Sequence, residues 1–289
     1  MGQKYKYSIV SKISFYLSYF WYKLILPFEV KTPKFRLWLY EWKYSIMKFK
    51  GYEISIPWKS SIDKIETIFG KFRIRLNTSD AANVSPAFER RDLNYLKRLI
   101  RQKLSKNRSV LFLDIGGDLG SYSVFVANSF KNKAVTIKCF EPIEESWSLI
   151  KENISSNNAN SQFELYPFAL YNEDNDNGEI RLDIDTPGSS SIKNDSSKNV
   201  KIIKIVTRRL DGVVDKEILK YDSIICKIDV EGVEQEVIEG MEKILSKTDD
   251  LTVMVEDFVN PEIIEYLERS NWSFISKVTS YNSWWKLEK

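Results

Sequence analysis

The sequence predicts an α/β fold in which a mostly parallel β-sheet carries helices on both faces. From residue 109 onward, apolar runs of five or six residues alternate with longer helical segments. Such runs are typical of strands buried on both sides, as they are in parallel sheets. Several runs end in an acid or a glycine, and ligands of such sheets bind beyond the carboxyl ends of the strands. The 289 residues suffice for one such domain with an extension.

The expected elements of the α/β part follow one another in a regular order. Strands are expected over residues 109–117, 135–142, 162–170, 178–184, 223–232 and 251–258, with a closing strand pair at 272–278 and 283–289. Helices are expected between them over residues 121–130, 144–158, 234–247 and 262–270. We therefore expect one α/β domain over residues 109–289.

Residues 51–108 are expected to lead into this domain. Two short alternating stretches, YEISIPW and KFRIRLN, are consistent with a small hairpin. A helix is expected over residues 85–104, with Ser85 as its N-cap and Pro86 in its first turn.

Residues 1–50 form a basic, aromatic extension. They hold ten Lys and Arg against two Glu, a local charge of +8, so the remaining chain sums to −5. Their uncharged run from Ile13 to Tyr22 is far shorter than the ~20 apolar residues that cross a bilayer, and no secretory cleavage site is present. Aromatic rings and Lys favour the boundary between membrane and water. We expect a helical extension that either lies on a membrane surface or packs on the body or on a second copy in a homo-oligomer.

The overall composition excludes several classes of function. The mildly acidic body beyond residue 50 is unlike a nucleic-acid enzyme, so no nucleic-acid partner is expected. The chain has no histidine, which leaves proton transfer to carboxylates, Lys, Tyr or water. Cys139 and Cys226 lie in apolar, strand-like runs and are expected to be buried and reduced in a cytoplasmic protein.

The expected strand ends carry a ligand-binding pattern. Asp114 ends the first strand, and Gly116 and Gly120 follow in the order acid-x-Gly-x-x-x-Gly. Glycine permits a sharp turn and a close approach of the backbone to a ligand. Glu141 ends the second strand, where an acid commonly accepts both hydroxyls of a ribose. The NAD fingerprint would need glycine in place of Ile115, so the pattern favours S-adenosylmethionine, which has an amino-acid tail and no pyrophosphate.

The stretch from about Leu111 to Glu256 resembles the FkbM-family methyltransferases. The matching blocks include LDIGGDLGSYS, FEPIEESWSLIKENISSNN and CKIDVEGVEQEVIEGM, of which KIDVEG-x-E is the most specific. The resemblance implies a class I methyltransferase fold, Rossmann-like with a mostly parallel seven-stranded sheet, and a methyltransferase domain over residues 109–289. It implies a cofactor site at Asp114, Gly116, Gly117, Asp118, Gly120, Ser121, Tyr122, Glu141, Pro142, Ala169, Leu170 and Asp229.

The chain departs from the family pattern in two places. Asp118 stands where the family usually has Asn; its carboxylate could accept a hydrogen bond from the ammonium of S-adenosylmethionine but would repel the carboxylate of the cofactor. Tyr171 and Asn172 stand where the family usually has Gly and Asp, next to the expected adenine contact. Both departures fall in the expected cofactor site.

Three acids are candidates for catalytic proton transfer. Methyl transfer to a hydroxyl requires alignment of the acceptor oxygen, methyl carbon and sulfur, and removal of the hydroxyl proton. Asp229 is expected to end the strand beside the one that ends in Asp114, next to the methyl group. Glu231, two residues further on, is expected to start the following turn, and Glu256 lies in the expected strand over residues 251–258. Clustered acids admit Mg²⁺ or Ca²⁺, but the spacing implies no metal.

The leading hypothesis is an S-adenosylmethionine-dependent O-methyltransferase of polysaccharide biosynthesis that acts on a hydroxyl of a sugar, glycan or glycolipid-linked acceptor. The acceptor class follows from the family resemblance. Residues 1–50 would suit an acceptor at the inner face of the cell membrane, contacted peripherally. Two alternatives stay open: a non-catalytic Rossmann-like binding or assembly module, and an NAD(P)-dependent oxidoreductase. Ile115 and the lack of a Tyr-x-x-x-Lys pair after the core strands disfavour the oxidoreductase.

Overall fold

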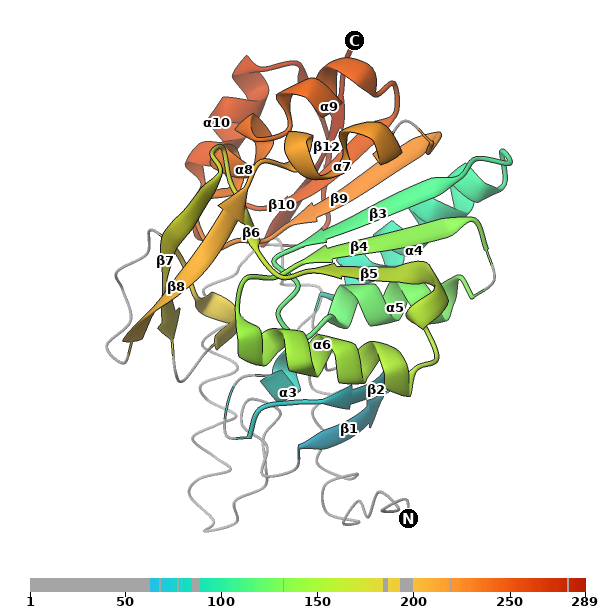
Figure 1. The fold of residues 1–289 in the computed structure, drawn as a ribbon. Helices are drawn as coiled ribbons and strands as arrows, with labels where there is room; N and C mark the ends of the chain where they lie inside the picture. The colour runs from blue at the N-terminus through green and yellow to red at the C-terminus, as the bar shows by residue number, and fades with distance from the viewer. Residues whose placement is uncertain are drawn as a thin grey trace, which may run out of the picture.

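Figure 1 shows the fold of the chain in a computed structural model. The structure describes residues 63–67, 69–76, 78, 80–84, 89–131, 133–183, 187–192, 200–218, 220–279 and 281–289. The basic extension expected over residues 1–50 lies outside the described residues, as do Ser85 and Pro86. Among the described residues, no helix has both the length and the apolar character needed to span a membrane.

A central sheet of seven strands forms the middle layer of the fold. In spatial order its strands are β11 (Trp272–Lys277), β12 (Asn282–Leu287), β10 (Leu251–Glu256), β9 (Ser223–Ile228), β3 (Val110–Ile115), β4 (Val135–Phe140) and β5 (Phe163–Tyr166). The strands from β10 to β5 pair in parallel, and β12 and β11 extend the sheet in antiparallel pairing. The predicted seven-stranded, mostly parallel sheet is therefore confirmed.

Helices cover both faces of this sheet (Figure 1). One face carries α4 (Arg90–Leu104), α5 (Ser121–Ser129) and α6 (Glu144–Ser156), and the other carries α7 (Leu210–Ile218), α8 (Glu234–Glu239), α9 (Glu242–Lys247) and α10 (Glu262–Arg269). Every residue of β3 and β9 is buried. Alternate side chains of β3 enter opposite clusters: Phe112 packs on one face, and Leu111 and Leu113 on the other. Each such burial contributes about 1.5–3 kcal/mol to stability.

A separate three-stranded sheet stands beside the central one (Figure 1). Its strands are β6 (Ala169–Leu170), β8 (Val200–Arg208) and β7 (Asn175–Asp183), in that spatial order. The prediction of one strand over residues 162–170 is wrong, because the run is divided between β5 and β6. Pro167 lies between the two strands and has no N–H to donate to a ladder. This division carries Ala169 and Leu170 out of the central sheet.

The helix predicted over residues 234–247 is likewise divided, into α8 and α9. The division falls at Gly240 and Met241, where the helical pattern is interrupted. A Cβ atom on Gly240 would collide with the backbone carbonyl of Tyr171. Close packing of two backbones therefore requires glycine at this position.

The chain before the sheet forms a small hairpin and a short helix. Strands β1 (Lys64–Thr67) and β2 (Gly70–Arg73) pair antiparallel, and α3 (Asp80–Asn83) follows. Helix α4 begins at Arg90, so the prediction that it starts after Ser85 is wrong. Glu89, in the left-handed conformation with φ +45°, is its N-cap.

Two side-chain amides at the C-terminal end of α6, those of Asn153 and of the C-cap Asn157, bind the hairpin to the domain. Asn153 accepts a hydrogen bond from the N–H of Arg73 and donates one to its carbonyl, and Asn157 pairs in the same way with Lys71. The two side chains lie one turn apart and so act as an added strand partner for β2. This clamp fixes where the chain after β2 enters the domain.

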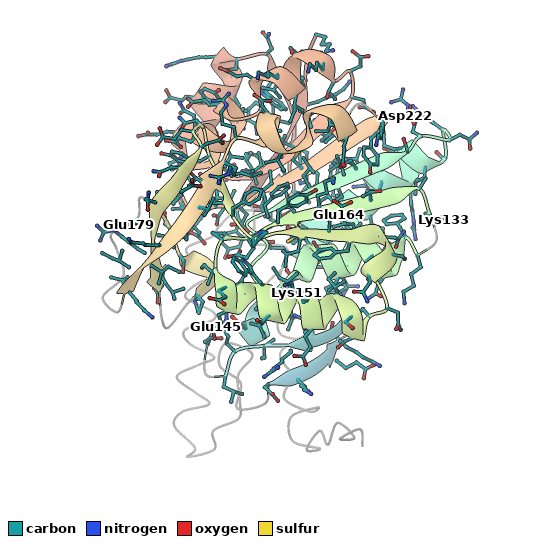
Figure 2. The ribbon with its side chains drawn as sticks, viewed as in Figure 1. Lys133, Glu145, Lys151, Glu164, Glu179 and Asp222 are labelled. Atoms are coloured by element: carbon teal, nitrogen blue, oxygen red, sulfur yellow. The ribbon has the colours of Figure 1, made fainter. Side chains whose placement is uncertain are left out.

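The surface of the molecule is charged and its cysteines are inside. Side chains such as Glu145 and Lys151 on α6 and Glu179 on β7 are exposed (Figure 2). Cys139 and Cys226 are buried and free, as their apolar surroundings predicted.

Candidate functional site

A pocket of about 390 Å³ opens at the carboxyl ends of β3, β4, β9 and β10. This is the edge at which ligands of parallel sheets bind. The pocket wall contains most of the predicted site residues, namely Gly116, Gly117, Asp118, Ser121, Tyr122, Glu141, Pro142, Ala169, Leu170, Asp229, Glu231 and Glu256. Asp114 and Gly120 do not line it. The predicted site residues are therefore gathered in one pocket wall, apart from these two.

The glycines of the loop after β3 are required by neighbouring protein atoms. Gly116 has φ +77°, and a Cβ there would collide with the backbone carbonyl of Asp229. A Cβ on Gly117 would collide with the sulfur of Cys139. Gly120, with φ +74°, is the N-cap of α5. The close approaches that these glycines permit within the chain are toward the backbone just after β9 and toward a side chain of β4.

Asp114 lies outside the pocket wall and is fixed by its polar neighbours. Its carboxylate is fully buried and accepts hydrogen bonds from the N–H and the hydroxyl of Ser123, at 3.0 and 2.6 Å. The Nζ of Lys227 lies 3.6 Å from Asp114 Oδ1 and 3.2 Å from Asp229 Oδ2, and it donates to the carbonyl of Gly116 at 2.7 Å. Burial alone would lower the pKa of Lys227, but the charges of Asp229 and Asp114 outweigh it and raise that pKa. Asp114 therefore joins the end of β3 to α5 and to Lys227.

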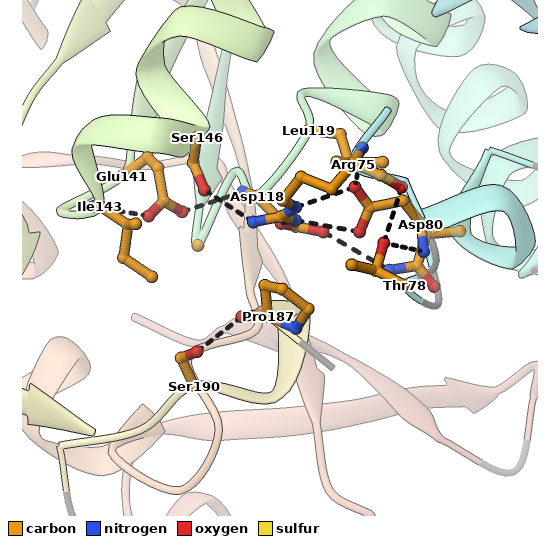
Figure 3. Close-up of polar contacts among 12 residues, drawn as sticks. Arg75, Thr78, Asp80, Asp118, Leu119, Glu141, Ile143, Ser146, Pro187 and Ser190 are labelled. Carbon is orange, nitrogen blue, oxygen red and sulfur yellow. Dashed lines mark hydrogen bonds and ion pairs between the residues drawn. The ribbon is translucent and has the colours of Figure 1, made fainter. Parts of the chain in front are cut away.

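Glu141 forms the wall of the pocket at the end of β4. Its Oε2 accepts a hydrogen bond from the N–H of Asp118 at 2.9 Å, and its Oε1 accepts one from the N–H of Ile143 at 2.8 Å (Figure 3). Burial raises its pKa to about 7. Each carboxylate oxygen has a second lone pair, so Glu141 can still accept hydrogen bonds from two hydroxyls.

Arg75 is a site residue that the sequence did not reveal. It follows β2, is 8% exposed, and binds Asp80 through two hydrogen bonds of 2.8 and 3.0 Å. The same guanidinium forms an ion pair with Asp118, whose other oxygen accepts a hydrogen bond from Asn83 at 3.4 Å (Figure 3). The charge of Asp118, which would repel a cofactor carboxylate, is therefore opposed by a buried cation. No motif distinguished Arg75 among the other basic residues of its segment.

The three predicted catalytic acids meet at one side of the pocket. One carboxylate oxygen from each of Asp229, Glu231 and Glu256 lies within 4.8 Å of the other two. Glu231 adopts the left-handed conformation with φ +57°. Burial and the charge of Asp229 raise the pKa of Glu231 to about 8, and the same two causes raise the pKa of Glu256.

Glu89 adds a fourth carboxylate to this side of the pocket. It is 6% exposed and accepts hydrogen bonds from the hydroxyl of Tyr122 at 2.8 Å and from the amide of Asn282 at 2.9 Å. Burial, followed by the charge of Asp229, raises its pKa to about 8. The sequence missed Glu89 because the expected helix over residues 85–104 placed it in a helix interior.

A loop from the small sheet closes one wall of the pocket. Pro187, Gly188, Ser190 and Ile192 line it. The hydroxyl of Ser190 donates to the carbonyl of Pro187 at 2.7 Å (Figure 3). The pocket is therefore walled by three parts of the chain: the strand ends, the segment before residue 90, and this loop.

Solved structures with a similar fold include several methyltransferases. The match to a structure described as methyltransferase FkbM from Methylobacillus flagellatus KT has 13% identity and a TM-score of 0.41, and covers 61% of this chain and 42% of that one. A methyltransferase from Geobacter sulfurreducens matches with 11% identity and a TM-score of 0.42, over 69% of this chain and 80% of that one. M. capricolum TrmK, solved with S-adenosyl-homocysteine, matches with 14% identity and a TM-score of 0.37, over 68% and 67%. No curated protein matches the chain.

A family model supplies the assignment. The model described as the methyltransferase FkbM domain matches residues 114–275, which is more than half of the chain. The matched range begins at Asp114, contains Glu141 and the three clustered acids, and ends in β11. The chain therefore belongs to the FkbM methyltransferase domain family.

Proposed function

We propose that this protein is an S-adenosylmethionine-dependent O-methyltransferase. The observation that carries the proposal is that one pocket joins two unlike halves. One half contains Glu141 and the glycine loop, and the other contains the carboxylates of Asp229, Glu231 and Glu256. The first half suits a nucleoside with an amino-acid tail, and the second suits an acceptor that must lose a proton.

The residues of the first half fit the cofactor. Glu141 would bind the ribose hydroxyls through its free lone pairs. Phe140, Ile143 and Leu170 give the pocket an apolar wall that suits adenine. The loop at Asp118, with its charge opposed by Arg75, would bind the amino-acid tail.

The departures at Tyr171 and Asn172 lie outside the pocket wall. The N–H of Tyr171 donates to the carbonyl of Arg208, and the amide of Asn172 donates to Glu239 at 2.8 Å. Both residues join β6 to neighbouring elements. We therefore expect the adenine contact to be made by Leu170 rather than by these two residues.

The carboxylates of the second half would handle the acceptor. When bound, the cofactor supplies a methyl group on a positively charged sulfur. Asp229 and Glu231 would orient the acceptor hydroxyl toward that methyl group and receive or relay its proton. As the oxygen–methyl bond forms, the methyl–sulfur bond breaks, leaving a methyl ether and S-adenosylhomocysteine. The negative charge of the acids also favours a sulfonium nearby.

The acceptor that we propose is a hydroxyl of a sugar, a glycan or a glycolipid-linked intermediate. Its support is the family resemblance, together with four carboxylates that can accept hydrogen bonds from several hydroxyls. Peripheral contact of residues 1–50 with the inner face of the cell membrane belongs to the same proposal and rests on their charge of +8 and their aromatic rings. Flotation of the full chain with anionic vesicles, against a chain lacking residues 1–50, tests the membrane contact; equal flotation would contradict it.

Thermal melting of the full chain tests the cofactor. We expect the melting temperature to rise with S-adenosylmethionine and with S-adenosylhomocysteine, but not with NAD, because binding to the native state alone stabilises it. The Glu141→Ala variant should lose most of this shift. A rise with NAD alone would contradict the proposal. Transfer of a labelled methyl group to candidate glycans then separates the enzyme from a binding module, which would bind the cofactor and methylate nothing.

A further inference from the structure

The cluster of Asp229, Glu231 and Glu256 has the donor set of a cation site. Each residue contributes one carboxylate oxygen, and the three oxygens lie within 4.8 Å of one another. Around a hard divalent cation with bonds of about 2.1–2.5 Å, coordinating oxygens are separated by about 3–5 Å. The three oxygens therefore fall within the separation that such an ion requires.

A second observation concerns Glu256 alone. Its Oε2 atom is buried and has no hydrogen-bond partner among the described residues. Buried carboxylate oxygens are nearly always satisfied, because an unpaired buried charge is costly. This oxygen belongs to the carboxylate that converges with those of Asp229 and Glu231. An ion bound to this carboxylate would give it the partner that it lacks.

The charged residues near the cluster also favour a bound cation, because acids outnumber bases there. Glu89 lies on the same side of the pocket as the three acids. Lys227 is the cation that contacts the cluster among the described residues, and it is shared between Asp229 and Asp114. Arg75, the other buried cation of the pocket region, is engaged by Asp80 and Asp118. When ionised, the acids of the cluster therefore carry more negative charge than Lys227 and Arg75 offset.

We propose that Asp229, Glu231 and Glu256 bind one hard divalent cation, Mg²⁺, Mn²⁺ or Ca²⁺, and that this ion holds the acceptor hydroxyl for methylation. Carboxylate oxygens are the ligands that these three ions share. Three protein ligands leave further coordination positions toward the pocket, where an acceptor oxygen can replace water. The role in methylation rests on the proposed function, whereas the binding of the ion does not.

The ion would act on the acceptor before methyl transfer. Coordination would lower the pKa of the hydroxyl, so that its proton leaves to water instead of to Asp229 or Glu231, which hold the ion, and the acceptor oxygen becomes a better nucleophile. The oxygen then forms its bond to the methyl carbon while the methyl–sulfur bond breaks. The ion keeps its charge throughout and is neither oxidised nor reduced.

Titration with Mn²⁺, followed by electron paramagnetic resonance of the free ion, tests the site directly. The full chain is first treated with a chelator and dialysed, and no cofactor is added. We expect one Mn²⁺ bound per chain, and we expect Mg²⁺ and Ca²⁺ to displace it. Glu231→Gln and Glu256→Gln should each weaken Mn²⁺ binding by about tenfold or more, because each removes a charged ligand.

Asp249→Asn is the matched control. It removes one negative charge just before β10, whereas Glu256 ends that strand. Asp249 is exposed and pairs with Lys289. Its Mn²⁺ affinity should equal that of the unaltered chain. Circular dichroism and the melting shift with S-adenosylhomocysteine show that each variant is folded.

Two results would overturn the cation site: no loss of the free Mn²⁺ signal with the unaltered chain, or equal affinities in the two glutamate variants and the control. Neither depends on the cofactor. If S-adenosylhomocysteine raises the melting temperature but no Mn²⁺ binds, the proposed function stands and the cation site is wrong. If Mn²⁺ binds but S-adenosylhomocysteine leaves the melting temperature unchanged, the cation site stands and the proposed cofactor is wrong.

Discussion

At the scale of single residues, the pocket owes its charge pattern to side chains whose neighbours come from distant parts of the sequence. The sequence alone shows that Asp118 departs from the family pattern, but its partner Arg75 lies 43 positions away in the chain. The glycines could be predicted because a left-handed turn or a close backbone approach requires glycine, whatever residues surround it. A salt bridge leaves no comparable mark, since either partner could face solvent. The sequence therefore predicted Gly116 and Asp118 but not Arg75.

The ion pair of Arg75 and Asp118 should control cofactor affinity. In Arg75→Met, Asp118 would face the cofactor carboxylate unopposed, so we expect the dissociation constant for S-adenosylhomocysteine to rise by about tenfold, roughly 1.4 kcal/mol. Adding Asp118→Asn should restore most of the affinity. Isothermal titration calorimetry of both variants measures this.

The same pair of variants separates affinity from stability. Asp80 is fully buried and would lose its charged partner in both, keeping the hydrogen bond from the N–H of residue 75, at a cost on the order of 3 kcal/mol in the free energy of unfolding. Chemical denaturation should therefore show equal destabilisation in Arg75→Met and in the double variant. If Asp118→Asn fails to recover affinity, the charge of Asp118 is not what the guanidinium offsets.

Glu89 should make stability depend on pH. Burial and the charge of Asp229 raise its pKa from an ordinary value of 4.5 to about 8, so between these values the folded chain holds a proton that the unfolded chain has lost. Its contribution is complete below about pH 4.5 and is lost as the pH rises through about 8. Glu89→Gln carries no such charge and should lose less stability between pH 6 and pH 9, by on the order of 2 kcal/mol.

Melting temperatures across that pH range measure the effect of Glu89. Glu145→Gln, on the exposed surface of α6, is the control and should follow the unaltered chain (Figure 2). Parallel curves for Glu89→Gln and the unaltered chain would show that Glu89 is charged in the folded state at all these pH values.

At the scale of elements, local pattern predicted the buried strands and failed where backbone contacts divide a run. The strands β3 and β9 are buried throughout and mostly apolar because both faces of the sheet are covered, and that signal is present in each strand by itself. The division of residues 162–170 into two sheets depends on Pro167. The division of residues 234–247 depends on Gly240 and its contact with Tyr171, which only the folded chain brings together.

The clamp between α6 and β2 should link stability to cofactor binding. Asn153→Ala would leave the N–H and the carbonyl of Arg73 without their partner and also remove a bond to the carbonyl of Leu119. We expect a loss of about 1–3 kcal/mol in the free energy of unfolding, measured by chemical denaturation. We also expect weaker binding of S-adenosylhomocysteine, because Arg75 lies only two residues after the end of β2.

Ser155→Ala, an exposed change on the same helix, is the control for the clamp. It should alter neither stability nor affinity by more than about 0.5 kcal/mol. A destabilised Asn153→Ala variant with unchanged affinity would mean that Arg75 keeps its place without the clamp.

At the scale of the whole molecule, the family-specific sequence and the complete pocket do not coincide. The family match begins at Asp114, whereas Arg75, Asn83 and Glu89 reach the pocket or its loop from upstream. The helix α4 also places Leu93 and Leu96 in the cluster that covers one face of the sheet. The resemblance rests on blocks inside the matched range, and it could not indicate a wall built by residues outside those blocks.

A chain limited to residues 109–289 should therefore lose both stability and cofactor binding. It would lack the guanidinium that opposes Asp118 and would expose the apolar surface that Leu93, Leu96 and Ile100 cover. At about 25 cal/mol per Å², the exposure of several such side chains is comparable with the whole stability of a domain. We expect this shorter chain to unfold without a cooperative transition in guanidinium and to show no measurable heat of binding with S-adenosylhomocysteine, while the full chain shows both. A cooperative transition and an unchanged dissociation constant would instead mean that the strand ends alone build the cofactor site, and that the upstream wall serves the acceptor.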